Sequence, residues 1–150
     1  MEYMMKTQRE AETFHLVRKI GDALIPGQII VFYGDLGAGK TVLTKGIAAS
    51  LGIEDTITSP TFTILQEYHD GRMPLYHLDV YRITDPDEME EVGLDDCLYG
   101  NGITVIEWAE MIEEILPENV LKITIDRVPE EGMDVRRILM EVPDETEFSI

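Results

Sequence analysis

One short segment, Gly34–Thr41 with the sequence GDLGAGKT, constrains the fold more than any other part of the chain. It fits the pattern G-x-x-x-x-G-K-[ST] at every fixed position. Glycines at these spacings let the backbone curl so that successive N–H groups point at phosphate oxygens, and the N-terminal end of a following helix adds positive charge. Lys40 is placed to reach the β- and γ-phosphates, and the Thr41 hydroxyl to ligate Mg²⁺. The segment therefore predicts a phosphate loop that binds a nucleoside triphosphate.

The residues on either side of this loop have the patterns that it requires. The apolar run Ile29–Tyr33 predicts a buried strand that leads directly into the loop. After the loop, Leu43, Ile47 and Leu51 recur every four residues, which predicts a helix with one apolar face. Gly52 follows as the expected C-terminal cap of that helix.

The N-terminal segment predicts another helix. Thr7 and Glu10 have the spacing of a capping box, in which Thr7 is the N-cap residue and Glu10 lies three positions further on. An apolar face at helical spacing follows, made of Phe14, Val17, Ile20 and Leu24.

The second half of the chain predicts mainly strands. Residues 62–68 and 75–81 flank a turn-like segment and predict a hairpin, as do residues 120–126 and 135–142 near the end. Residues 103–107 predict a buried strand, and residues 108–116 a helix that ends at a proline. The expected fold is α/β: a single P-loop NTPase domain over residues 1–150, with a mixed parallel and antiparallel sheet flanked by helices and a C-terminal β-hairpin.

The charge balance restricts the partners of the chain. Thirty acidic residues against 12 basic ones give a formal net charge of -18. Because nucleic acids are bound largely through Lys and Arg, direct binding to free DNA or RNA is not expected. The dense acidic segment 85–96 is either a solvated surface or a docking surface for a basic partner. With one cysteine, Cys97, and no apolar run long enough to span a bilayer, we expect a cytoplasmic protein without membrane attachment.

The missing motifs narrow the nucleotide class. A regulatory GTPase would carry N-K-x-D and D-x-x-G, and neither pattern occurs in the sequence. ATP is therefore the expected nucleotide. A small-molecule kinase is the alternative reading, although the only close-set basic pair beyond the second helix is Arg136–Arg137. A nucleotide-gated binding module with negligible catalysis is a third possibility.

Two acidic residues near strand ends are the candidate catalytic groups. Glu107 ends the apolar run ITVIE, the Walker-B arrangement that holds Mg²⁺. Asp79 lies near the end of another expected strand, and Thr61 in SPTF is a hydroxyl that could sense Mg²⁺ and the γ-phosphate. The three histidines lack metal-ligand spacing, and His77 is interpreted as a structural strand residue.

Four motifs together resemble those of a known family. GDLGAGKT, SPTF, HLDVYR and IEWAE, in this order and spacing, are similar to the TsaE-type bacterial P-loop ATPase of tRNA threonylcarbamoyladenosine biosynthesis. The resemblance runs from Thr7 to about Asp126. It implies an ATP- and Mg²⁺-dependent ATPase that acts on a TsaB–TsaD complex as a nucleotide-gated switch, and that meets tRNA only indirectly through that complex.

The resemblance also implies roles for individual residues. The expected ATP-binding residues of the loop are Asp35, Leu36, Gly37, Ala38, Gly39, Lys40, Thr41 and Val42. Thr41 and Glu107 would hold Mg²⁺, while Asp79 would organise the metal or the attacking water, and Thr61 would act as a switch. The segment around Thr7 and Glu10 would lie near the adenine. Tyr81, Arg82 and Trp108 match the family pattern without an assigned role, and Trp108 is expected to be a packing residue.

Overall fold

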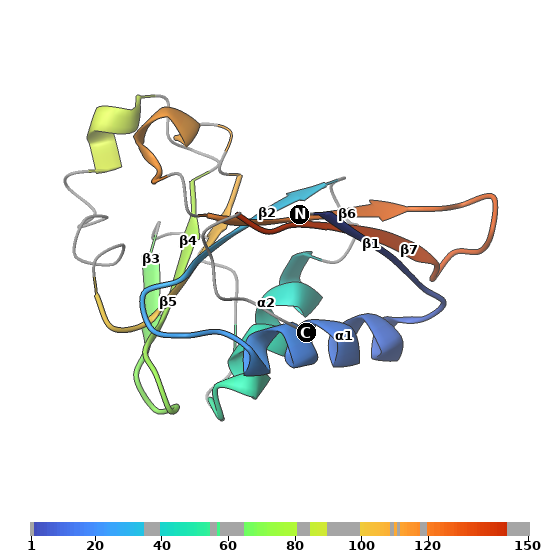
Figure 1. The fold of residues 1–150 in the computed structure, drawn as a ribbon, viewed down its shortest axis with the longest axis horizontal. Coiled ribbons are helices and arrows are strands. Elements are labelled where there is room, and N and C mark those ends of the chain that lie inside the picture. The colour runs from blue at the N-terminus through green and yellow to red at the C-terminus, as the bar shows by residue number, and fades with distance from the viewer. Residues whose placement is uncertain are drawn as a thin grey trace.

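The strand that leads into the predicted phosphate loop lies in the middle of a seven-stranded sheet, between two parallel neighbours (Figure 1). The computed structural model describes residues 2–34, 40–54, 57, 65–80, 85–89, 100–108, 110, 112–117 and 120–143. Within them the strands are β1 (Glu2–Thr7), β2 (Ile29–Gly34), β3 (Leu65–Tyr68), β4 (Leu75–Asp79), β5 (Ile103–Glu107), β6 (Leu121–Arg127) and β7 (Arg136–Glu141). The helices are α1 (Glu10–Asp22) and α2 (Lys40–Ser50), with short 3₁₀ helices at Pro86–Glu88 and Glu113–Ile115.

The sheet is parallel at its centre and antiparallel at both sides. Its strand order is β1-β7-β6-β2-β5-β4-β3. Strands β6, β2, β5 and β4 run parallel, whereas β1, β7 and β3 pair antiparallel with their neighbours. The two predicted hairpins are confirmed as β3–β4 and β6–β7, so the expected mixed α/β architecture is also confirmed.

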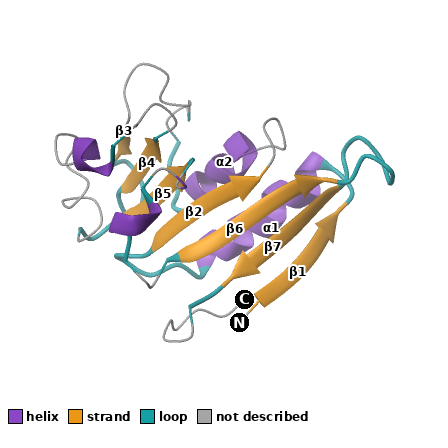
Figure 2. Ribbon diagram, turned by 90° about the horizontal axis from the view of Figure 1, so that it is seen from above, coloured by secondary structure: helices purple, strands orange, loops and turns teal. Residues whose placement is uncertain are grey.

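Both α-helices cover the same face of the sheet, and in Figure 2 they lie behind the strands. Val17 and Ile20 on α1 are buried as predicted, and so is Leu24 just after the helix, whereas Phe14 is only partly buried. Small residues let the two helices approach closely, since a Cβ on Gly46 would press against the Val17 side chain.

The helix after the phosphate loop is also confirmed. Its apolar face of Leu43, Ile47 and Leu51 is completely buried in the core. Gly52 follows in the left-handed region, with φ of 77°, as the predicted C-terminal cap requires. The helix therefore begins at Lys40, within the last two residues of the loop motif, and ends where the sequence indicates.

The predicted capping box at the N-terminus is wrong. Thr7 is the last residue of β1, which pairs with β7, and α1 begins only at Glu10 with Arg9 as its N-cap residue. The buried Thr7 hydroxyl is hydrogen-bonded to the Thr13 hydroxyl at 2.6 Å. Glu12, rather than Glu10, reaches back and accepts a hydrogen bond from the Gln8 backbone N–H at 3.0 Å. The pairing of β1 with β7 therefore outweighs the local sequence signals that predict a helix start at Thr7.

The predicted helix over residues 108–116 is also wrong in its described part. Trp108 has a φ of 63°, in the left-handed region, which is incompatible with continuing a right-handed helix. The described residues of this segment include the three-residue 3₁₀ helix Glu113–Ile115 but no α-helical turn. Ile112, just before it, is completely buried in an apolar cluster that includes Val31 and Leu78. No helix in the described part of the chain has the length and apolarity needed to cross a membrane.

Gly34, at the end of β2, should be intolerant of any side chain. Its φ is 134°, and a Cβ there would overlap the Ile125 carbonyl oxygen on β6. We expect Gly34→Ala to lower the free energy of unfolding by about 3 kcal/mol, since strain and overpacking add. Urea denaturation measures this loss.

Gly52→Ala is the matched control for this measurement. Gly52 also has a positive φ, but there is open space around its Cβ position. Gly52→Ala should therefore lower the free energy of unfolding by only about 1 kcal/mol. Equal losses for the two variants would contradict the close approach at Gly34.

Candidate functional site

The two candidate acids lie side by side at one edge of the sheet. Asp79 ends β4 and Glu107 ends β5, and the register of these parallel strands pairs the two residues directly. A backbone hydrogen bond of 3.2 Å from the Val80 N–H to the Glu107 carbonyl holds the strand ends together. Glu107 is only 5% exposed, whereas Asp79 is half-buried. Residues separated by 28 positions in the chain therefore form one acidic pair.

The phosphate-loop strand ends at the same edge. Phe32 on β2 pairs with Glu107, so β2 passes directly beside the acidic pair and ends two residues later at Gly34. The helix α2 then begins at Lys40. Parallel strands direct their carboxyl ends to one edge, which is where ligands bind in open α/β sheets. Val42 is partly buried on α2, and the side chains of Lys40 and Thr41 lie outside the described residues.

Glu107 has a partner that sequence reasoning missed. His77 Nε2 lies 2.7 Å from Glu107 Oε2, and the His77 side chain is only 1% exposed. The available signal was strand alternation: His77 and Asp79 are two residues apart on β4, so both side chains project from the same face of the sheet. His77, interpreted from the sequence as a structural strand residue, thus contacts the candidate acid.

The oxygen atoms at this edge fit a magnesium site. Mg²⁺ in nucleotide sites usually takes one or two protein carboxylates and completes its coordination with phosphates and water. Asp79 and Glu107 provide such carboxylates beside the strand that leads into the loop. The described residues contain no group of three or more His, Cys, Asp or Glu side chains arranged to hold a metal by themselves.

Several predicted site residues lie outside the described residues: Asp35, Leu36, Gly37, Ala38, Gly39, Thr61, Tyr81 and Arg82. Their roles remain predictions. Thr7 and Glu10 are described. The pairing of Thr7 with Arg136, and of Arg136 with Arg127, places Thr7 at the same sheet edge as the end of β2, but with β6 and β7 between them. Its hydroxyl is engaged with Thr13, and Glu10 is exposed. The described structure thus brings Asp79 and Glu107 together and leaves Thr7 and Glu10 apart from them.

Comparison with known proteins identifies the family of the chain. The model of the family described as threonylcarbamoyl adenosine biosynthesis protein TsaE matches residues 7–138. The chain belongs to the TsaE family. The TsaE protein of Bacillus subtilis is 47% identical over 133 residues, which is 89% of this chain and 81% of that protein. The TsaE protein of Treponema pallidum is 46% identical over 106 residues, covering 71% and 78% of the two chains.

A solved structure supports the same fold. The crystal structure of YdiB from Bacillus subtilis superposes with a TM-score of 0.78 and 40% sequence identity, over 95% of this chain and 86% of that one. The TsaE family and its α/β sheet are therefore established for this chain by both sequence and structure.

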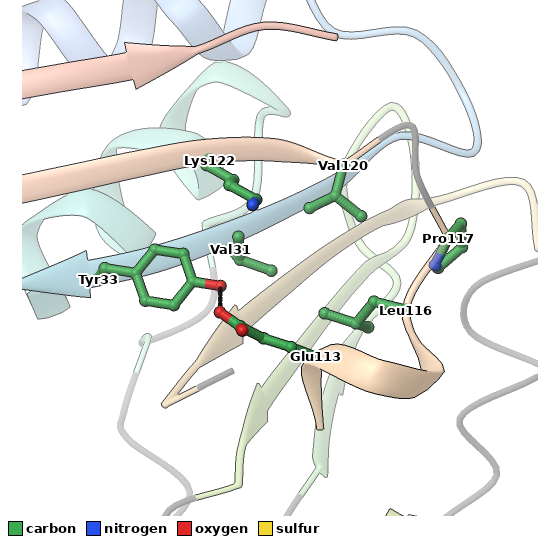
Figure 3. A pocket seen from close by; sticks show the side chains of 7 residues that line it. All are labelled: Val31, Tyr33, Glu113, Leu116, Pro117, Val120 and Lys122. Atoms are coloured by element: carbon green, nitrogen blue, oxygen red, sulfur yellow. Dashed lines mark hydrogen bonds between the residues drawn. The ribbon is translucent and has the colours of Figure 1, made fainter. Parts of the chain in front are cut away.

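This TsaE chain has a pocket on the sheet face opposite the two helices (Figure 3). The pocket has a volume of about 380 Å³ and is lined by Val31, Tyr33, Glu113, Leu116, Pro117, Val120 and Lys122. The Tyr33 hydroxyl donates a hydrogen bond of 2.6 Å to Glu113 Oε1. Trp108 packs against the apolar cluster that contains Val31 and Val120, as expected for a packing residue. The segment after β5 is thereby joined to the residue just before Gly34.

The Tyr33–Glu113 contact predicts an alkaline loss of stability. Burial raises the pKa of the Tyr33 phenol above its ordinary value of 10.0, and the Glu113 carboxylate raises it further. The folded state thus holds this proton more tightly than the unfolded state. The resulting stabilisation is present below about pH 10 and is lost as the pH rises above it.

Tyr33→Phe should cost about 1 kcal/mol at neutral pH, because one hydrogen bond is lost. It should also make the fall in unfolding free energy between about pH 9 and 11 shallower. Urea denaturation across this range measures both effects. In Glu113→Gln, which retains an acceptor without the charge, the slope should be intermediate. A wild-type slope in Tyr33→Phe would contradict the assignment.

Proposed function

We propose that this chain is the ATP-hydrolysing subunit required for threonylcarbamoyladenosine modification of tRNA. The observation that carries the proposal is the Asp79–Glu107 pair at the carboxyl ends of β4 and β5, directly beside the strand that leads into the phosphate-loop sequence. The reaction class needs a phosphate-binding loop and carboxylates that position Mg²⁺ at one edge of a parallel sheet. The names of the TsaE relatives supply the tRNA modification.

Each residue has a part in the proposed hydrolysis of ATP. Residues 35–42 bind the nucleotide, with Lys40 on the β- and γ-phosphates. Thr41 and Glu107 hold Mg²⁺, which neutralises charge that develops on the phosphates. Asp79, paired with Glu107, orients the metal or the attacking water. Thr61 responds to the γ-phosphate as a switch, so that the bound nucleotide sets the state of its loop.

Charge favours an indirect contact with tRNA. With a formal net charge of -18, the chain repels a phosphate backbone and attracts a basic protein surface. We propose that it acts in the cytoplasm by docking on a TsaB–TsaD complex, where TsaD performs the transfer to adenosine. ATP binding and hydrolysis would then alternate two docking states.

Removing Lys40 or Glu107 should abolish turnover. Lys40→Ala and Glu107→Ala are each expected to slow phosphate release from ATP at least about a hundredfold, because Lys40 brings positive charge to the phosphates and Glu107 holds the metal that does the same. Phosphate release and circular dichroism are measured on the same samples. Glu130→Ala is the matched control, since Glu130 is an exposed acid in the β6–β7 turn. Normal turnover by both site variants would contradict the proposed roles.

The partner is tested with the full system. Phosphate release by the purified chain should increase, or become coupled to threonylcarbamoyl transfer, when a TsaB–TsaD complex and tRNA are added. A rate of phosphate release that does not change when the complex is added would contradict the docking proposal. Phosphate found on a small-molecule acceptor, when a metabolite pool is added, would support a kinase instead.

A further inference from the structure

Beside the proposed magnesium ligand lies a polar side chain that the proposed chemistry does not use. His77 is 1% exposed, Glu107 is 5% exposed, and His77 Nε2 lies 2.7 Å from Glu107 Oε2. The two residues come from adjacent parallel strands, β4 and β5. Burying two such groups side by side costs free energy unless their hydrogen bonds are satisfied. An apolar side chain at position 77 would spare the burial of the imidazole but would leave the buried Glu107 carboxylate without this contact, so the histidine is matched to the carboxylate.

The chemistry of the two groups sets the direction of the hydrogen bond. An ionised carboxylate only accepts hydrogen bonds, so Nε2 must carry the hydrogen and donate it to Oε2. The other ring nitrogen, Nδ1, is buried and has no hydrogen-bonding partner among the described residues. A histidine kept only to satisfy the core would be expected to bond through both nitrogens. Within the described structure, the polar interaction of this ring is directed at Glu107.

We propose that His77 is a positioning residue, which fixes the orientation of the Glu107 carboxylate that would hold Mg²⁺. This inference rests on the proposed role of Glu107 as a magnesium-linked acid. A glutamate side chain has three rotatable bonds, so a carboxylate without such a contact samples several orientations. The hydrogen bond from His77 selects one orientation before the nucleotide arrives. Carboxylates that bind metals are commonly held in this way by a neighbouring donor.

Three variants separate positioning from packing. His77→Leu removes the donor but keeps an apolar side chain of similar bulk, and His77→Gln retains an N–H at about the position of Nε2. Thr104→Val is the matched control, because Thr104 is also 1% exposed on β5 but lies on the opposite face of the sheet. Loss of the Thr104 hydroxyl should alter the free energy of unfolding without changing the orientation of the Glu107 carboxylate.

The measurements are magnesium affinity and turnover. Mg²⁺ is titrated in the presence of a non-hydrolysable ATP analogue, with fluorescence of the only tryptophan, Trp108, as the readout next to Glu107. His77→Leu should weaken the apparent Mg²⁺ affinity about 10- to 100-fold and lower kcat with it. His77→Gln should recover most of both, and Thr104→Val should match the wild type. Wild-type Mg²⁺ affinity and kcat in a folded His77→Leu variant would overturn the proposal.

A second measurement needs neither nucleotide nor a mutant that folds. In wild-type protein labelled with ¹⁵N-histidine, nitrogen–proton correlation NMR shows which nitrogen of His77 carries hydrogen. Hydrogen on Nε2 supports the proposal, and a ring with hydrogen only on Nδ1 overturns it. If wild-type protein binds no nucleotide with Mg²⁺, the proposed function fails, while the NMR result still decides whether His77 holds Glu107.

Discussion

The parallel pairing of β5 with β2 on one side and β4 on the other is the constraint on which the site depends. Parallel strands share a direction, so their carboxyl ends meet at one edge of the sheet. Gly34, Asp79 and Glu107 are far apart in the chain, yet this pairing brings the three strand ends together. A change of one residue in the register of β5 would turn Glu107 to the opposite face, away from α2.

That placement creates an electrostatic problem which the structure resolves locally. Glu107 lies on the face that α1 and α2 cover, beside Phe32, and is almost completely buried. A carboxylate removed from water needs hydrogen-bond donors or positive charge. His77 provides one donor from the adjacent strand. The proposed metal would provide the positive charge, so the same burial that costs free energy in the empty state would strengthen metal binding.

The opposite face of the same strands has a different task. Side chains alternate along β2, so Phe32 enters the core below α1 and α2 while Tyr33 faces the pocket lined by Glu113 and Leu116. The Tyr33–Glu113 hydrogen bond ties the segment after β5 to the end of β2. The two strand ends that flank the proposed nucleotide site are therefore linked through backbone pairing in the sheet and through side chains behind it.

Local patterns were sufficient for much of this protein. The apolar run Ile29–Tyr33 predicts β2, and the spacing of Leu43, Ile47 and Leu51 predicts α2. The glycine-rich motif between them predicts a loop. Each of these signals depends only on residues that are neighbours in the chain. The place of Glu107 at the end of a buried strand follows from the run ITVIE for the same reason. Only the tertiary structure decided that the N-terminal residues form β1 on β7, that Trp108 turns the chain out of a helix, and that His77 meets Glu107. Those outcomes depend on which strands pair and in which register, and the residues that meet are distant in sequence.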